Sequence, residues 1–269
     1  MTIRPGNQLG GARLALAVLL LVAGGGPEAR LKAAPVISEA ASAVIDPQAG
    51  KELVARMLAE RPAEQARLTG QVKIRRFGYE SSPLPFAFTA APAANGWTAQ
   101  YETLLSPTNA AYESLRIDHA RGRTNDYWQV VARPATSGWT LLTNRVLYPT
   151  NHFGGSDFFL GDLGLEFLHW QAQTVIKKEM KRGRFCHVLE SKPGPADRSL
   201  GYSKVISWVD NETHGIIQAD AHDRQGKLLK QFELNSFKKV DGQWRLEEME
   251  IRNVQAKSRT RLTFDLSGP

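Results

Sequence analysis

The sequence is poor in cysteine and in long apolar runs. Cys186 is the only cysteine in 269 residues, so no internal disulfide can form and the fold must rely on its hydrophobic core. The apolar run Leu14–Ala23 ("LALAVLLLVA") falls well short of the about 20 residues that a membrane-spanning helix needs. With 42% hydrophobic residues, the chain is long enough to form one sizeable domain.

The motifs of common active sites are missing as well. The histidines form no His-Glu-x-x-His spacing, no Gly-x-Ser-x-Gly elbow exists, and no glycine-rich phosphate loop ends in Lys-Ser/Thr. Asp220, His222 and Asp223 come nearest to a metal cluster, but a strand end running into a turn explains them better. Cys186 and His187 are strand neighbours that point to opposite faces, so they cannot form a catalytic dyad. We therefore predict a protein that is not an enzyme and holds no cofactor or metal.

The N-terminus has the pattern of an export signal. Arg4 and Arg13 precede the apolar run without any acidic residue, and three glycines follow it. A basic segment, a short apolar segment and small residues are typical of a secretory signal peptide, which we assign to residues 1–25. No cysteine stands directly after the apolar run, so the mature protein is not expected to be lipidated at its N-terminus. We expect a periplasmic protein with a flexible leader over residues 26–45 and a single domain over residues 46–269.

Acidic residues are fewer than basic ones. The formal charge of +7 falls to +5 when Arg4 and Arg13 are removed with the signal peptide. Export makes nucleic acid a poor partner, whereas an anionic membrane surface or an acidic protein suits the surplus, as does a simple solvated surface. The basic residues are densest between Lys177 and Arg184, at a predicted hairpin tip that either docks on a membrane or is solvated. We expect a monomer.

The segment "DPQAGKELVARMLAERP" predicts one helix near the start of the domain. Asp46 can cap it, Pro47 suits the first helical position, and Pro62 ends it. Its apolar side chains form a stripe on one face: Leu53, Val54, Met57 and Leu58.

From residue 65 onward the apolar residues alternate with polar ones, which is typical of antiparallel strands with one solvated face. Hairpins are predicted near Arg182-Gly183 and at Asp241-Gly242. The apolar parity shifts within "QFELNSF" and within "QWRLEEMEI", so we expect bulges that let long strands bend. The prediction is a mainly β fold: one half-open, strongly curved antiparallel sheet of about eleven strands, an incomplete barrel. The N-terminal helix and a helical or loop lid cover it.

The stretch "FGGSDFFLGDLGLEFLHW" is the candidate lid. Gly161 and Gly164 interrupt it, and a glycine inside a helix costs roughly 0.5–1 kcal/mol relative to alanine, so we expect a broken, soft helix. Ser156 is expected to cap it, and Asp157 and Asp162 suit helix starts. Aromatic and leucine side chains recur at helical spacing, which predicts one apolar stripe, either plain core or a movable cover: Phe159, Leu163, Phe167 and Trp170.

Three groups of motifs resemble those of the outer-membrane lipoprotein-sorting proteins, the LolA-like carriers of the bacterial periplasm. "GGSDFFLGDL" is similar to that family's Gly-Ser-Asp-Phe…Asp-Leu motif. "YSKVISWVDNETHGIIQADAHDRQGKLLKQF" resembles its tyrosine-lysine, Trp-Val-Asp and Gly-Lys-x-x-Lys pattern. "VDGQWRLEEMEIRNVQAKSRTRLTF" resembles its Asp-Gly-x-Trp…Met…Asn…Thr-x-Leu-x-Phe ending. The resemblance covers roughly residues 65–266 and implies a half-open barrel that wraps a lid over an apolar cavity.

The resemblance implies a carrier that binds the acyl chains of lipoproteins, or of a related lipid, for sorting to the outer membrane. Membrane-bound donor and acceptor proteins are then expected partners. The alternative is a sensor or regulatory module that uses the same half-barrel to bind lipoprotein or a membrane protein. The resemblance implies that an arginine near the cavity mouth holds the lid by hydrogen bonds. By alternation Arg76 points inward and is the candidate, either as this latch or as a solvated arginine at the rim. The expected lid and lipid-binding residues are Phe158, Phe159, Leu163, Phe167 and Trp170. The expected cavity wall comprises Leu68, Val72, Ile74, Phe86, Phe88, Trp97, Tyr101, Phe232, Leu234, Trp244, Met249, Ile251 and Phe264.

Overall fold

The computed structural model describes residues 45–104, 112–135, 138–240 and 243–266. The expected signal peptide and nearly all of the leader lie outside these ranges. No helix within them is long and apolar enough to cross a membrane.

The N-terminal helix forms where the sequence predicts it, as α1 (Pro47–Ala59). The Asp46 carboxylate accepts a hydrogen bond from the backbone N–H of Ala49, and Pro47 starts the helix. Three residues of the predicted stripe are buried, while Leu58 remains 42% exposed. Asp46 also exchanges two backbone hydrogen bonds with Val175, so the start of the helix is fixed to a strand of the sheet.

All fourteen strands that the structure describes belong to one antiparallel sheet that is not closed into a barrel, which confirms the predicted fold class, although the strands outnumber the expected eleven. The first half of the chain contributes β1 (Ala66–Arg76), β2 (Tyr79–Glu80), β3 (Leu84–Ala93), β4 (Gly96–Leu104), β5 (Tyr112–Ala120), β6 (Asp126–Ala135) and β7 (Gly138–Val146). The second half contributes β8 (Ala172–Lys181), β9 (Arg184–Lys192), β10 (Tyr202–Asp210), β11 (Ile216–Asp223), β12 (Leu228–Val240), β13 (Gln243–Asn253) and β14 (Ser258–Phe264).

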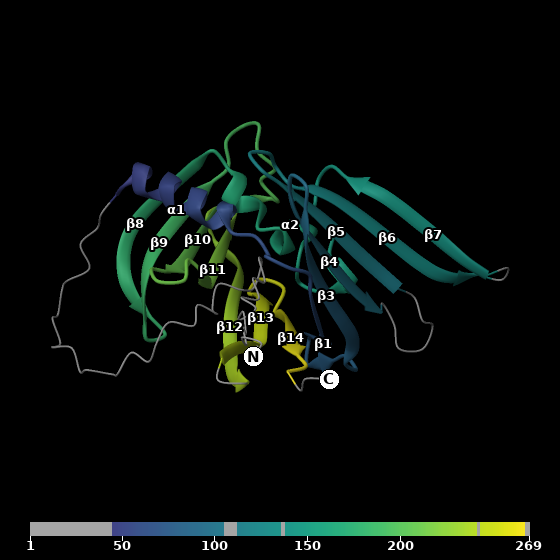
Figure 1. Ribbon diagram of the computed structural model, residues 1–269. Helices are drawn as coiled ribbons and strands as arrows, with labels where there is room; N and C mark the ends of the chain where they lie inside the picture. Colours follow the sequence, from purple (N-terminus) through teal and green to yellow (C-terminus); the bar gives the residue numbers. More distant parts are fainter. Residues whose placement is uncertain (1–44, 105–111, 136–137, 241–242, 267–269) are drawn as a thin grey trace, which may run out of the picture.

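The strands form two meanders that meet at a single seam. One meander runs from β1 through β3 to β7 and the other from β8 to β14, and β1 pairs with β14 where they meet. Strands β7 and β8 are therefore the two edges of the sheet. Figure 1 shows the meanders as two wings on either side of β12, β13, β14 and β1.

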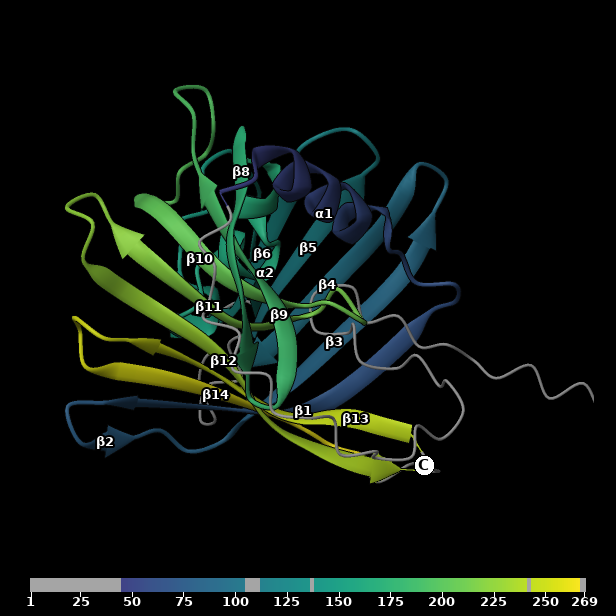
Figure 2. The ribbon, with the colours of Figure 1, turned by 90° about the vertical axis from the view of Figure 1, so that its left-hand side faces the viewer.

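The chain between the two edge strands crosses the concave side of the sheet. This connection contains η1 (Phe153–Gly155), α2 (Leu160–Leu163) and η2 (Glu166–His169), and α2 lies between the wings in Figure 1. Helix α1 covers the end of the wing formed by β8 to β10, as Figure 2 shows from the side. A connection from one edge to the other must span the mouth of the half-barrel, which is why this segment covers the interior.

The predicted broken helix in this connection is confirmed at Gly164, whereas Gly161 lies inside α2. Gly164 ends α2 and Leu165 adopts a left-handed conformation with φ of 49°, so α2 and η2 have different directions. A Cβ atom on Gly164 would lie 2.2 Å from the hydroxyl oxygen of Tyr127, so the strand behind it demands glycine here. Phe159, not Ser156, precedes α2, and the backbone N–H of Phe159 donates to the Asp162 carboxylate over 2.8 Å.

The expected turns and bulges position the long strands. Arg182 and Gly183 join β8 to β9 with φ of 50° and 75°, in agreement with the predicted hairpin. The register of β12 against β13 shifts on either side of Ser236, which confirms the bulges that the parity changes predict. The other predicted turn, Asp241-Gly242, lies outside the described residues.

The core consists of two clusters on the concave side. The larger lies against the first meander and the seam and contains Phe86, Phe88, Tyr101, Met249 and Phe264. The smaller lies under α1 against the second meander and contains Leu53, Val175 and Val205. Phe232 of β12 packs against both clusters, so the interior is continuous from one wing to the other.

Candidate functional site: the lid and the interior it fills

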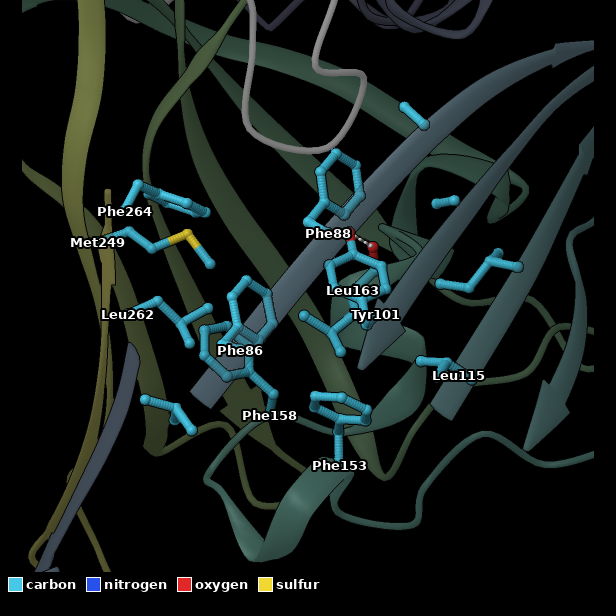
Figure 3. Packing of buried hydrophobic residues seen from close by; sticks show 14 of the residues in the cluster. Phe86, Phe88, Tyr101, Leu115, Phe153, Phe158, Leu163, Met249, Leu262 and Phe264 are labelled. Atoms are coloured by element: carbon cyan, nitrogen blue, oxygen red, sulfur yellow. Dashed lines mark hydrogen bonds between the residues drawn. The ribbon is translucent and has the colours of Figure 1, made fainter. Parts of the chain in front are cut away.

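The first half of the segment that covers the sheet fills the larger cluster. We call residues 153–170 the lid. Phe153, Phe158 and Leu163 are each at most 5% exposed and point toward the aromatic side chains of β3 and β4 (Figure 3). Tyr101, fully buried on β4, donates a hydrogen bond to the carbonyl oxygen of Leu163. The lid thus fills the middle of the half-barrel with its own side chains.

The second half of the lid packs into the smaller cluster beneath α1. Phe167, Leu168 and Trp170 are buried there, and the Phe167 and Trp170 rings meet edge to face at 6.4 Å. The indole N–H of Trp170 donates to the carbonyl oxygen of Arg198, and the Gln173 amide donates to the carbonyls of Phe167 and Trp170. Apolar burial and main-chain hydrogen bonds both hold this part of the lid.

Two cavities beside the lid, the larger and the more apolar, bear on what it can bind. The larger, about 460 Å³, opens between the end of α1, the β4–β5 side of the sheet and residues 164–169, and His119, His169 and His214 line part of it. The smaller, about 50 Å³, lies between the lid and β10 to β13 and is almost wholly apolar. Sites for drug-sized ligands usually measure about 300–1,000 Å³, so the apolar cavity is too small for an acyl chain while the lid is in place.

Each of the three acidic side chains of the lid contacts the sheet. Asp157 is 1% exposed, and its carboxylate accepts hydrogen bonds from Ser258 over 2.5 Å and from Thr260 over 2.8 Å, both on β14. Its backbone N–H donates to the same Thr260 hydroxyl. Asp157 therefore ties the lid to the seam between the meanders, which corrects its expected role at a helix start.

Glu166 anchors the other end of the lid. It accepts a hydrogen bond from the Tyr127 hydroxyl over 2.8 Å and forms an ion pair with Arg198 at 3.0 Å. Burial raises the pKa of the Glu166 carboxyl, whereas Arg198 and the Tyr127 hydrogen bond oppose that rise. Asn125 adds a hydrogen bond to the carbonyl of Gly164. Strand β6, the residue just before it and the connection between β9 and β10 thus hold this end of the lid through polar contacts.

Asp162 joins the lid to the second meander through a buried lysine. Lys230 of β12 is 2% exposed, and its ammonium lies 2.9 Å from the Asp162 carboxylate and 3.1 Å from the centre of the Phe159 ring. The Tyr202 hydroxyl of β10 donates to the other oxygen of Asp162 over 2.9 Å. Burial lowers the pKa of Lys230, and the neighbouring Asp162 acts against that shift.

Sequence reasoning did not single out Lys230 as a functional residue, although a signal was present. Tyr202, Lys230 and Asp162 each belong to a motif of the stated family resemblance. The structure brings these three motifs to one point, which no single motif indicates.

The predicted latch residue lies at the opposite rim. The Arg76 guanidinium at the end of β1 donates a hydrogen bond over 2.6 Å to the carbonyl oxygen of Gly155 in the lid. Glu113 accepts a hydrogen bond from the backbone N–H of Gly154 next to it. Arg76 thus contacts a lid carbonyl, as its inward parity predicts, while its side chain remains exposed to solvent.

The other predicted site residues are distributed over both clusters. Phe158 and Leu163 lie in the larger cluster, Phe167 and Trp170 lie in the smaller, and Phe159 packs at the edge of the smaller. Trp97 belongs to the larger cluster but also stacks on His119 at the mouth of the 460 Å³ cavity. Apart from Trp244, whose side chain is outside the described part, all predicted wall residues belong to the larger cluster or pack against it. Their contact with lipid stays a prediction.

The interior offers little reactive chemistry. Cys186 is fully buried, and desolvation raises the pKa of its thiol to about 11, which opposes formation of a nucleophilic thiolate. Within the described ranges, no three His, Cys, Asp or Glu side chains gather closely enough to hold a metal ion. Apolar surfaces and buried ion pairs therefore define what this site can bind.

The basic hairpin tip is not a bare cationic patch. Arg182 pairs with Glu233 and also donates to the Leu234 carbonyl, while Arg184 pairs with Asp210. Lys181 lies 4.3 Å from the ring of Trp208. These basic side chains therefore contact the second meander, which favours a structural role for them over membrane docking.

Solved structures show that the fold is that of LolA-like proteins. A DUF1329 family protein from Desulfovibrio piger matches with a TM-score of 0.64 and 19% identity, covering 82% of this chain and 92% of that chain. A domain described as an outer membrane lipoprotein-sorting protein, from Vibrio parahaemolyticus, gives 0.65 and 19%, covering 83% and 95%. A LolA superfamily protein from Nitrosomonas europaea gives 0.54 and 16%, covering 82% and 92%. These matches confirm the predicted resemblance at the level of the fold.

The family is shown by the sequence itself. A family model described as an uncharacterized protein matches residues 105–266, which is more than half of the chain, and the protein belongs to that family. No protein of curated function matches the sequence.

Proposed function

We propose that the protein is a non-enzymatic periplasmic carrier that binds the acyl chain of a lipoprotein or related lipid when the lid moves out of the half-barrel. One observation carries this proposal: a connection that does not pair with the sheet supplies several of the apolar side chains that fill the concave side, where they pack against those of the strands. If the lid moved out, it would expose an apolar space lined by both meanders. The LolA-like fold supports a carrier of this kind.

The energetics of the lid favour reversible binding. Burial of one large apolar side chain contributes about 1.5–3 kcal/mol, so the seven buried side chains of the lid would together contribute about 10–21 kcal/mol to the closed state: Phe153, Phe158, Leu160, Leu163, Phe167, Leu168 and Trp170. Burial of a 16-carbon acyl chain, at about 0.8 kcal/mol per methylene, is worth about 12 kcal/mol. Because the two are similar, a chain can replace the lid without becoming irreversibly bound.

Identifying any lipid that co-purifies with the protein tests the proposed function. We expect acyl lipid in a stoichiometric amount when the protein is purified from the periplasm without detergent, extracted with organic solvent and examined by mass spectrometry. The delipidated protein should bind an uncharged fluorescent reporter, N-phenyl-1-naphthylamine. A lipid-free protein that does not bind the reporter but captures one membrane protein would contradict the carrier and favour a sensor.

A reversible lock tests whether the lid must move. The 2.8 Å contact between the Asp157 nitrogen and the Thr260 hydroxyl places the two Cα atoms within about 7 Å, which is close to disulfide range. Oxidised Asp157→Cys, Thr260→Cys protein should lose reporter binding, and reduction should restore it. The reduced form of the same variant is the control, and equal binding by both forms would show that the lid stays in place.

A further inference from the structure

The lid covers a charge that the apolar interior does not need for packing. Lys230 lines the small apolar cavity together with Phe158, Phe232, Met249 and Ile251. A buried lysine is rare unless it is paired, because the interior disfavours the ammonium form. Burial lowers the pKa of this lysine, in keeping with its surroundings.

The ion-pair partner and the nearest aromatic cover of the Lys230 ammonium both belong to the lid, whereas the Tyr202 ring of β10 lies farther away, at 5.7 Å. The Asp162 carboxylate is its ion-pair partner, and among the described residues no other carboxylate lies within 4.0 Å of its nitrogen. The Phe159 ring covers the same nitrogen from 3.1 Å. The Tyr202 hydroxyl donates to Asp162 and not to the lysine. Outward movement of α2 therefore removes the counter-ion and the aromatic cover together, while Lys230 stays on β12.

An open lid would leave an unpaired cation inside an apolar space, and loss of one partner of a buried ion pair is strongly unfavourable. A ligand that brings a negative charge to Lys230 removes that penalty, whereas a neutral chain does not. The apolar lining beyond Lys230 suits a hydrocarbon tail attached to that charge.

We infer that Lys230 is the head-group contact of the carrier and that the ligand is an anionic amphiphile, with a carboxylate or phosphate group joined to an acyl or alkyl chain. The ligand's anion takes the place of the Asp162 carboxylate, and its tail takes the place of the lid's apolar side chains. This inference rests on the proposed carrier function.

Competition among ligands of one chain length tests the inference. The full-length mature protein is loaded with N-phenyl-1-naphthylamine, and dodecanoate, dodecyl phosphate, dodecanol and inorganic phosphate are titrated as competitors at 150 mM salt. The readout is the ratio of the affinities of each anionic competitor and dodecanol. A hydrogen bond to a charged group predicts a ratio of at least about ten for the wild type.

Two variants measure the contribution of Lys230 to the affinity ratio. Asp162→Asn keeps one side-chain oxygen, which can still accept from the Tyr202 hydroxyl, but removes the competing charge, so the ratio should be at least as high as in the wild type. Asp162→Asn with Lys230→Met removes both charges, which leaves no buried ion unpaired and is often tolerated. Its ratio should fall to about one. Lys238→Met, an exposed lysine on the same strand, is the matched control and should behave like the wild type.

The outcomes separate the two proposals. No reporter binding by the wild type would contradict the carrier itself. Reporter binding with a ratio near one, or a ratio that survives the loss of Lys230, would overturn the assignment of Lys230 and leave the carrier standing. Displacement by inorganic phosphate as effective as by dodecyl phosphate would show a free-anion site and would overturn the amphiphile.

Discussion

At the scale of single residues, strand alternation separates two adjacent arginines. Arg76 shares the parity of the buried Val72 and contacts the lid, whereas Arg75 lies on the other face of the same strand. The sequence therefore predicts which arginine can reach the lid, although it cannot show that Gly155 supplies the acceptor, because the two residues are 79 positions apart.

Arg76→Leu should make the lid easier to open. The variant loses one charge-assisted hydrogen bond at an exposed site, which we expect to contribute about 1 kcal/mol to closure. Reporter affinity should therefore rise by up to about fivefold in a fluorescence titration. Arg75→Leu is the matched control, and an equal rise in both variants would contradict a latch at Arg76.

The acidic residues of the lid show where sequence reasoning stops. A helix start explains Asp162 in part, since it accepts the Phe159 N–H. Asp157 and Glu166 instead contact partners far away in the chain, Thr260 and Tyr127. The local sequence pattern contains no information about such distant partners. A carboxylate that is buried against another strand is therefore predicted to be an ordinary helix cap.

At the scale of elements, the strands were predictable and the lid was only partly so. Alternation fixes which side of β1, β3 and β4 is buried, and the parity shifts place the bulge in β12. The break between α2 and η2 depends on the close approach of Gly164 to Tyr127, which arises from tertiary packing. The glycines of the stripe therefore predict that the helix breaks, and tertiary packing sets the break at Gly164.

The attachment of the lid to β14 can be weakened selectively. Thr260→Val keeps the shape of the side chain but removes its hydrogen bonds with Asp157, so the closed state should lose about 1–3 kcal/mol. Hydrogen exchange should accelerate in the lid while the strands stay protected. Thr263→Val, exposed on the same strand, is the control. Uniform acceleration across the sheet would mean that the contact stabilises the whole fold instead.

At the scale of the whole molecule, two histidines make stability depend on pH. Burial lowers the pKa of His119 to about 3 and that of His169 to about 4. The unfolded chain, with histidine pKa values near 6.5, therefore binds more protons than the folded chain between about pH 4 and 6.5. The free energy of unfolding should fall by about 1.4 kcal/mol per pH unit for each histidine as the pH decreases through this window.

Urea unfolding at pH 7, 6 and 5 checks this dependence. The raised pKa of Glu166 acts in the opposite direction, because that carboxyl binds a proton more readily in the folded state. His119→Asn should flatten the curve relative to the wild type. A midpoint that rises from pH 7 to pH 5 would contradict neutral buried histidines.

The seam between β1 and β14 sets the order in which the molecule can assemble. The seam pairs Gly70 with Phe264 and Arg76 with Ser258, which are 194 (264 − 70) and 182 (258 − 76) positions apart. The adjacent pairs, β1 with β3 and β13 with β14, are instead joined by short connections. Long-range pairings form slowly because loop-closure entropy must be overcome first. Each meander can therefore form locally, but the interior stays open until the last strand is in place, so a chain that lacks its final residues cannot close around anything.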